Sequence, residues 1–547
     1  MDFDGDGDTD VVGFGDTVPT LHENTLPTSK PRISISLRQP QAKGPSDMRG
    51  VVVTVVHGDR TDVVLPEHPN LVLGFGARPS VVTATWPNGV SQYLLDPEVA
   101  RHHDMLIPTK LEGSCPFLYA WDGEKHRFVT DLLGISPLGL ALAPGVYAPV
   151  DPDEYLRLPD WVRPRQGRID LRFTEELREV TYLDAFELLA VTHPEGTVAH
   201  SYEKWTFPSV DGFDLRLTDT PRPVRAWDEE GREVSDLLAG RDHRYFGGTR
   251  RRPRYQGVME PWSMVVELPA EVAAADDPVL LLTGWLQWGN TSTNIARSQT
   301  GERPMFPVAE VPDGLGGWVP ATVDVGLPAG KTKPVFVSLK GALNPDDPRV
   351  RLTTDFEVWW DEVSAAAGVV RDEATAVRRV PSSRAELRAG GFSRMWRPGE
   401  NGPHLFDYTR RTAHPTRPTP DGEHRPVVWT PLQGHRTAFG PVGELLGSVD
   451  DRSVVFGDGE ELVLEFDVSG QARRPGETIT WFILSHGWAK DGDPNVAYSQ
   501  TSGPLPWSGM GTDPYADSGP PEAIMDSLRP TLSRFVGPEH LRQRLPR

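Results

Sequence analysis

The sequence predicts a mostly β protein with few helices, and three observations support this prediction. Glycine and proline number 53 each among 547 residues, which is typical of chains with many turns between short strands. Runs rich in β-branched residues, some of them alternating, follow one another from about residue 33 onward. Three landmarks occur twice in the same order over the C-terminal two-thirds of the chain, which indicates an internal duplication.

Composition and charge disfavour several classes of function. The formal net charge is −21 and the acids are spread along the chain, so we expect no nucleic-acid partner and no anionic membrane partner. The acidity suits either solubility or cation binding. Cys115 is the single cysteine, which rules out an intrachain disulfide and a zinc site with several cysteine ligands. The uncharged stretch 132–150 contains three prolines and three glycines, so we expect a packed apolar loop and no membrane span.

The first residues carry a metal-binding pattern. Aspartates stand at every second position of a glycine-rich segment, at Asp2, Asp4, Asp6, Asp8 and Asp10. Carboxylates that turn inward together suit Ca²⁺, which takes 6–8 oxygen ligands. The pattern D-x-D-G-D-G-D-x-D-V resembles the calcium loop of FG-GAP repeats over residues 1–20. The resemblance implies carboxylate ligands from the first, second, third and fifth of these aspartates and a carbonyl ligand from Asp8. Only one copy is present.

The N-terminus also bears on location. No basic segment followed by an apolar one opens the chain, so we expect no secretory signal there. The cytoplasm is then the default location, and an extracellular or periplasmic one would follow if the N-terminus were truncated.

The segment 30–107 reads as a succession of strands, at 33–37, 50–56, 62–65, 71–76 and 80–86, with a turn at Pro87-Asn88-Gly89. Its G-x-x-V-x-V strand and its V-x-x-x-W-P-N-G ending resemble the ASPIC/UnbV domain, which commonly follows FG-GAP repeats in cartilage acidic protein-like sequences. The usual arginine after the first glycine is replaced by Val51 or Val52. The resemblance implies an architecture rather than an activity.

The duplicated landmarks define the remainder. The segment 179–184 is echoed by 357–361, 236–244 is echoed by 444–452, and 284–300 is echoed by 487–501. We expect two β-sandwich modules of jelly-roll type, at 168–348 and 349–515, that pack about a pseudo-twofold axis. A bridging hairpin and the apolar loop should occupy 108–167. Helix is predicted at two places only. One is 364–377, and the other is 521–535, which lies in a helical tail at 516–547. The stretch from 108 onward resembles the uncharacterised C-terminal extension of some bacterial FG-GAP and ASPIC/UnbV proteins.

Two sets of residues are candidates for function, because nucleotide-loop and hydrolase signatures are absent from the sequence. The first set joins tryptophans to recurring amides, which either satisfy backbone groups or bind a ligand; its members are Trp285, Asn294, Gln299, Trp359, Trp360, Trp488, Asn495 and Gln500. The second set is acidic and suits either acid–base catalysis or a solvent-facing or cation-binding edge; its members are Asp355, Glu357, Asp361 and Asp491. We expect a pocket near the contact between the two modules.

Three functions remain open at this point. The leading hypothesis is a Ca²⁺-binding, β-rich protein that binds a glycan or another small molecule. The alternative is a calcium-dependent enzyme, a hydrolase, lyase or natural-product cyclase that uses Asp and Glu. A third possibility is an adhesion or scaffold protein. The sequence determines neither the ligand nor the oligomeric state.

Overall fold

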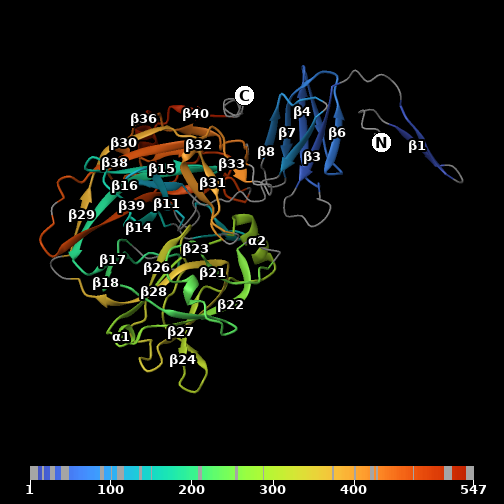
Figure 1. Cartoon of the computed structure of the whole chain (residues 1–547). Coiled ribbons are helices and arrows are strands. Elements are labelled where there is room, and N and C mark those ends of the chain that lie inside the picture. The colour runs from blue at the N-terminus through green and yellow to red at the C-terminus, as the bar shows by residue number, and fades with distance from the viewer. Residues whose placement is uncertain are drawn as a thin grey trace. The chain divides into compact units, whose positions relative to one another are not determined.

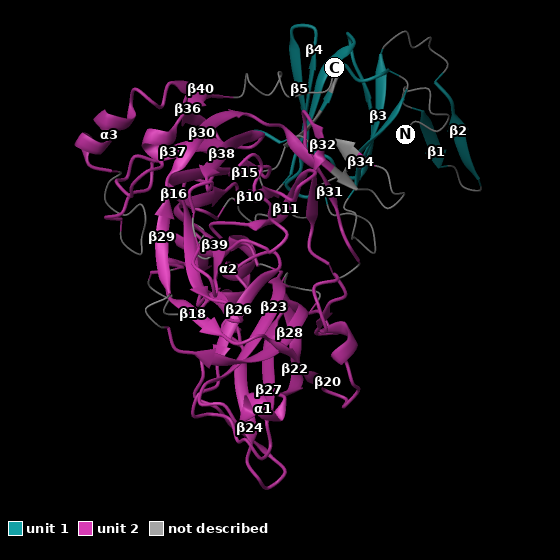
Figure 2. Ribbon diagram, turned by 60° about the vertical axis from the view of Figure 1, so that its left-hand side comes forward, with its two compact units in different colours: residues 1–111, 426–430, 538–547 teal, residues 112–425, 431–537 magenta. Residues whose placement is uncertain are grey.

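The computed structural model confirms the mostly β fold class (Figure 1). The residues that it describes are 10–14, 18–24, 31–38, 48–86, 91–99, 101–106, 116–134, 138–148, 151–206, 212–252, 257–287, 289–371, 375–399, 402–418, 424–426, 429–471, 473–493, 495–510 and 520–537. They form two compact units (Figure 2), which are Met1–Leu111 with Pro426–Thr430 and Pro538–Arg547, and Glu112–Arg425 with Pro431–Gly537.

The first unit contains a hairpin and two small sheets. The hairpin pairs β1 (Val11–Phe14) with β2 (Pro19–His22). A three-stranded sheet has the order β6-β3-β9, with bounds Asn70–Gly74, Arg32–Arg38 and His102–Leu106. A four-stranded sheet has the order β5-β4-β7-β8, with bounds Arg60–Val64, Val52–His57, Pro79–Thr85 and Ser91–Leu95. Alternate residues of β4 are buried, as its period-2 pattern predicts, and they join the core around Ile35, Val82 and Trp86.

The second unit is built around two β-sandwiches, and we call the first the outer sandwich. One of its sheets has the order β11-β10-β15-β38-β30-β36, with bounds His126–Asp131, Phe117–Trp121, Arg168–Glu175, Glu460–Asp467, Ser382–Ala389 and Gly440–Pro441. The other has the order β14-β39-β16-β29, with β37 also on β16; the bounds are Asp153–Arg157, Glu477–Asp491, Glu179–Pro194, Ala376–Val380 and Val454–Gly457. A shared core that includes Leu171, Phe186 and Leu464 fills the space between the sheets.

We call the second one the inner sandwich. One sheet has the order β17-β18-β28-β23-β26, with β19 and β21 also on β28; the bounds are Val198–Ser201, Leu215–Thr218, Val358–Val369, Pro278–Leu286, Lys333–Ser338, Arg222–Pro223 and Phe246–Gly247. The other has the order β20-β22-β27-β24-β25, with bounds Arg225–Asp228, Val258–Glu267, Arg349–Phe356, Val308–Pro312 and Trp318–Pro320. Its core includes Met264, Leu282 and Leu352.

The inner sandwich is one continuous stretch of chain, 198–369, inserted between two strands of the outer one. The strands that flank the insertion, β16 and β29, pair directly, with Thr192 opposite Ala376. The two expected modules, 168–348 and 349–515, are therefore each divided between the two sandwiches: β16 pairs with β39 and β23 pairs with β28. Figure 1 shows the strands of the inner sandwich gathered below those of the outer one.

The duplicated landmarks occupy equivalent positions in these two strand pairs. Tyr182 lies opposite Trp488 in one pair, and Trp359 lies opposite Trp285 in the other. The next residue on each strand faces a glycine, and a Cβ on Gly487 would stand only 2.2 Å from the Tyr182 carbonyl oxygen. The register then slips by one residue in both pairs, at Asp184 and at Asp361.

Strand β16 is buried almost along its full length, which requires cover on both faces. One face contributes Leu188 and Ala190 to the core of the outer sandwich. The opposite face packs in part against Leu528, at the end of helix α3 (Glu522–Leu528), and in part against Leu215 of the inner sandwich. Helix α3 is thus a packed part of the second unit.

The remaining elements are short. The hairpin of β10 and β11 forms within the stretch where a hairpin is predicted. Four small pairs are β12–β13 (Ala141–Ala143, Val146–Tyr147), β31–β32 (Phe392–Trp396, Leu405–Thr412), β33–β34 (Thr416–Pro418, His424–Pro426) and β35–β40 (Gly434–Arg436, Arg534–Val536). Two 3-10 turns occupy Ser235–Leu237 and Gly443–Leu445, at the second duplicated landmark.

The predicted helix at 364–377 is wrong, because β28 extends through Val369 and β29 begins at Ala376. Two helices that the prediction omits are α1 (Ala270–Ala273) and α2 (Thr291–Gln299). Among the described residues, no helix is long and apolar enough to cross a membrane.

Candidate functional site

A cavity of about 1160 Å³ lies where the two sandwiches meet. The outer sandwich contributes β11 and β14 to its wall, and the inner sandwich contributes β17, β23, β26 and β28. The hairpin of β31 and β32 completes the lining. The volume exceeds the roughly 300–1,000 Å³ of pockets that hold drug-sized ligands.

Aromatic side chains form much of this wall, and they come from every contributing part of the chain. The lining aromatic residues are Phe128, Trp161, Phe336, Trp396, Phe406 and Tyr408. Phe406 is fixed by stacking on Phe117, with 4.0 Å between the ring centroids. Trp396 is 43% exposed although it lies on a strand, so its ring remains accessible from the solvent side.

Charged side chains surround these rings. The lining cations are Lys125, Arg127, Arg157, Arg241, Arg394 and Arg410, and the lining acids are Asp122, Asp160, Asp361, Glu362 and Asp407. Three ion pairs form among them: Arg157 with Asp160 at 2.6 Å, Arg241 with Glu362 at 2.8 Å and Arg410 with Asp407 at 3.5 Å. Within the part of the chain that is described, no carboxylate lies within 4.0 Å of the guanidinium of Arg127 or of Arg394.

Three histidines of the lining have lowered pKa values. Burial, together with Arg157 and Arg241, lowers the pKa of His200 to about 3. Burial lowers the pKa of His243 with help from Arg127, and that of His424 with help from Arg394. Because neighbouring arginines act in each case, these histidines are neutral near pH 7.

Buried ion pairs join the two sandwiches beside the cavity. Lys333 of β26 binds Glu154 of β14, and both side chains are almost fully buried. The backbone N–H of Lys331 donates to Asp131 of β11 at 2.7 Å, and the Lys331 ammonium lies 3.5 Å from the same carboxylate. Removing one partner of such a pair leaves a buried charge without compensation, so this network fixes the distance between the walls.

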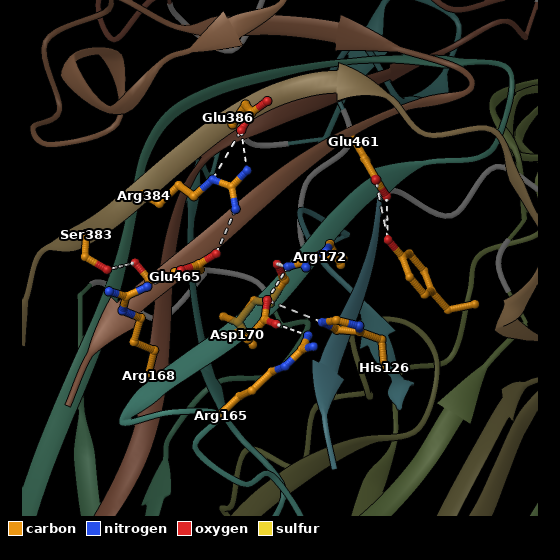
Figure 3. A network of polar contacts seen from close by, with 12 residues as sticks. His126, Arg165, Arg168, Asp170, Arg172, Ser383, Arg384, Glu386, Glu461 and Glu465 are labelled. Carbon is orange, nitrogen blue, oxygen red and sulfur yellow. Dashed lines mark hydrogen bonds and ion pairs between the residues drawn. The ribbon is translucent and has the colours of Figure 1, made fainter. Parts of the chain in front are cut away.

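A polar network beside the cavity holds His126 (Figure 3), and a second contact holds Tyr408. The His126 Nε2 lies 3.3 Å from the Asp170 carboxylate, which also binds Arg172 and Arg165. Burial favours a raised pKa for Asp170, but the neighbouring His126 and Arg172 outweigh it, and the pKa is lowered. The Tyr408 hydroxyl donates to Glu461 at 3.1 Å. These contacts hold both rings from behind.

The predicted acids do not gather at one place. Of the four, Asp361 alone is among the described residues that line the cavity. Asp355 is buried and binds Arg297 of α2 at 2.7 Å, while Glu357 binds Arg251 at 2.6 Å. Asp491 lies opposite Glu179 in the β16–β39 ladder, and burial raises its pKa to about 6.

Asp361 is fully buried at the register slip of β28. Its Oδ1 accepts the backbone N–H of His243 at 2.9 Å, and its Oδ2 has no hydrogen-bond partner among the described residues. Burial raises its pKa to about 6. Asp184 at the equivalent slip of β16 has the same features: it accepts backbone N–H groups of Asp450 and Asp451, and burial raises its pKa to about 6.

The predicted tryptophans are part of the packed core. Trp285, Trp359, Trp360 and Trp488 are each at most 6% exposed. The amides make local bonds: Asn294 donates to the Gly289 carbonyl at 3.4 Å, and Gln500 donates to the Gly492 carbonyl at 3.2 Å. Gln299 is an exposed residue at the end of α2.

One of these amides links the two copies of the third landmark. Asn495 donates to the Ser292 hydroxyl at 2.7 Å, and Ser292 donates to Asp493 at the same distance. The amides thus stabilise loops of the second unit.

Most of the predicted calcium loop lies outside the described residues, since Asp2, Asp4, Asp6 and Asp8 belong to the segment 1–9. Asp10 is described: it is 3% exposed, and its carboxylate accepts the backbone N–H of Asn24 at 2.9 Å. Within the described part of the chain, no cluster of three or more His, Cys, Asp or Glu side chains could hold a metal ion.

Sequence reasoning missed most of the cavity. The residues Arg127, Arg157, Arg241, Arg394 and Trp396 belong to no recognisable short motif, and they converge only because the inner sandwich is inserted into the outer one. The available signal was the arginines beside tryptophan and tyrosine in the segment 394–411.

Comparisons with known proteins add no assignment, because no family model, no curated protein and no solved structure matches this chain. The resemblance to FG-GAP and ASPIC/UnbV proteins therefore remains a prediction from the motifs.

Proposed function

We propose that the protein binds a saccharide, or a small molecule of similar polarity, in the cavity between the two sandwiches. The observation that carries this proposal is the composition of the lining, where accessible aromatic rings stand among hydrogen-bonding and charged groups. Aromatic faces cover the apolar faces of sugar rings, and polar groups orient the hydroxyls. Buried ion pairs between the walls support a preformed site.

Trp396 provides the first test, because its exposed ring faces the cavity while the strand that carries it is anchored elsewhere. We expect Trp396→Ala to weaken saccharide binding by about tenfold or more, equivalent to about 1.4 kcal/mol. The matched control is Trp318→Ala, since Trp318 is partly exposed on β25 and does not line the cavity. Binding is measured by calorimetry and thermal shift with trimers of galactose and of galacturonate.

Two outcomes contradict the proposal. One is that neither trimer shifts the melting temperature or gives a binding heat. The other is that Trp396→Ala and Trp318→Ala change the affinity equally.

The enzymatic alternative depends on Asp361, whose Oδ2 has no partner among the described residues and whose raised pKa suits a proton donor at the cavity wall. The equivalent Asp184 has the same environment and is not among the residues that line the cavity. This likeness favours a structural role for both. If Asp361 were the general acid of a hydrolase or lyase, Asp361→Asn would reduce turnover by roughly 10²–10⁴-fold and Asp184→Asn would not.

We also propose that the N-terminal aspartates bind Ca²⁺. The support is the alternation of five aspartates in the sequence, which repel one another without a cation. Asp10, whose carboxylate accepts the Asn24 N–H, would be one of the ligands.

A further inference from the structure

We infer that the saccharide is anionic, carrying carboxylate or sulfate groups that the cavity arginines bind. This inference rests on the proposed function and names the class of its ligand. Guanidinium groups that have no carboxylate partner among the described residues stand beside accessible aromatic rings in one cavity.

The charge of the lining is the opposite of the charge of the chain. The whole chain has 56 Lys and Arg against 77 Asp and Glu, whereas the lining has six against five, counted from the residues named above. Two of the five acids are already engaged by backbone N–H groups: Asp122 accepts those of Glu124 and Lys125, and Asp361 accepts that of His243. An acidic protein that concentrates arginine in the cavity between its two sandwiches is suited to attract an anion there.

Arg127 and Arg394 are the groups best placed to bind it. Neither guanidinium has a carboxylate within 4.0 Å among the described residues, so each has donors that a ligand can use. The Arg127 guanidinium lies over the Trp161 ring, 4.9 Å from its centroid. Arg394 and Trp396 are two residues apart on β31, so their side chains share one face of the strand. Arg127 thus lies over one aromatic ring, and Arg394 shares a strand face with another, so a cation and a ring lie near each other at both places.

Three of the four described histidines that line the cavity support the same sign of potential. His243 faces Arg127, His424 faces Arg394, and His200 faces both Arg157 and Arg241, and burial acts with these arginines to hold all three neutral. Burial and the neighbouring Arg241 also lower the pKa of Arg157, against the opposing effect of Asp160. Together with the one additional cation of the lining, this favours an anionic ligand.

The experiment compares three ligands of one length and sugar type: the trimers of galactose, galacturonate and sulfated galactose. We expect both acidic trimers to bind the whole protein at least tenfold more tightly than the neutral one. Arg127→Gln and Arg394→Gln should each weaken the acidic trimers by about 10- to 100-fold, as expected for a charged hydrogen bond, and leave the neutral trimer unchanged. The control is Arg349→Gln, which removes the same charge. Arg349 is exposed, pairs with Asp347 and is not among the residues that line the cavity.

A salt series on the unaltered protein keeps the inference testable even if a variant is poorly folded. Raising the salt from about 0.1 M to about 1 M shortens the Debye length from roughly 10 Å to roughly 3 Å and should weaken only the acidic trimers. The inference is overturned if the neutral trimer binds as tightly as both acidic ones, or if Arg349→Gln weakens binding as much as Arg127→Gln does. If the neutral trimer still binds and Trp396→Ala abolishes that binding, the proposed function stands and the anionic class of the ligand does not. Preference for one acidic trimer identifies the anionic group.

Discussion

Asp184 and Asp361 occupy equivalent positions in the two copies and have the same environment. Both occupy a slip in the register between two long strands, and both accept backbone N–H groups from the loop after a 3-10 turn. The interrupted strand ladder offers no carbonyl acceptor to the backbone N–H groups of this loop. The carboxylate provides the acceptor instead. The cost is burial of a group that prefers water when ionised, and this raises both pKa values to about 6.

The sign of the resulting pH dependence follows from these values. A carboxyl group whose pKa rises from 3.8 to about 6 on folding holds its proton more tightly in the folded chain. Each aspartate therefore reduces the free energy of unfolding as the pH increases from about 4 to about 6. Asp184→Asn and Asp361→Asn retain an acceptor and remove this titration. We expect the melting temperature of each variant, relative to that of the parent protein, to increase as the pH rises across this window. Parallel plots of melting temperature against pH would contradict the raised pKa values.

At the scale of single elements, sequence patterns were most reliable where local and global requirements agreed. The alternating strands of the first unit and the hairpin of β10 and β11 lie where the sequence predicts them. The alanine-rich segment 364–369 favours helix locally, but it completes a central strand in which Ala365 and Ala366 are fully buried. Helix α2 does have a start signal in the sequence, which is the capping residue Asn290. Its side chain accepts the Thr293 N–H at 2.8 Å.

The calcium loop is the element that remains to be tested. We expect Asp4→Asn together with Asp6→Asn to reduce calcium affinity, because a hard cation loses two anionic ligands. The melting temperature of the variant should fall below that of the parent in calcium and match it in chelator. Calorimetry with CaCl₂ measures the affinity directly, and equal binding by variant and parent would refute the loop.

At the scale of the whole molecule, the sequence indicated the duplication. It did not indicate that each copy is divided between the two sandwiches. The strand parts of the landmarks fall on equivalent strands, as in Trp285 and Trp488, whereas α2 has no helical counterpart at 495–501. Either copy could close on itself or exchange a hairpin with the other, since both arrangements bury the same apolar faces. Pairing between strands about 300 residues apart has no local signature, so neither the nested sandwiches nor the cavity between them could be read from the sequence.

Division of the chain within the exposed turn around Asn344 tests this arrangement. The cut separates β16 from β39 and also β23 from β28, the central pair of each sandwich. We expect the fragments 112–345 and 346–537 to lack cooperative thermal unfolding when alone and to regain it when they are produced together. Near-ultraviolet circular dichroism and calorimetry follow both states. Independent cooperative folding of either fragment would show that the modules are separable after all.

The nested insertion also determines the order in which the newly made protein can fold on the ribosome. The inner sandwich can close once β28 has emerged, whereas β16 must wait for β39, about 280 residues further along the chain. At about 5–20 residues per second, that delay is roughly 15–60 s. For this time a strand whose side chains are almost all destined for burial is without its principal partner. The protein's yield in a cell should therefore depend on chaperones that shield nascent chains more than on its final stability.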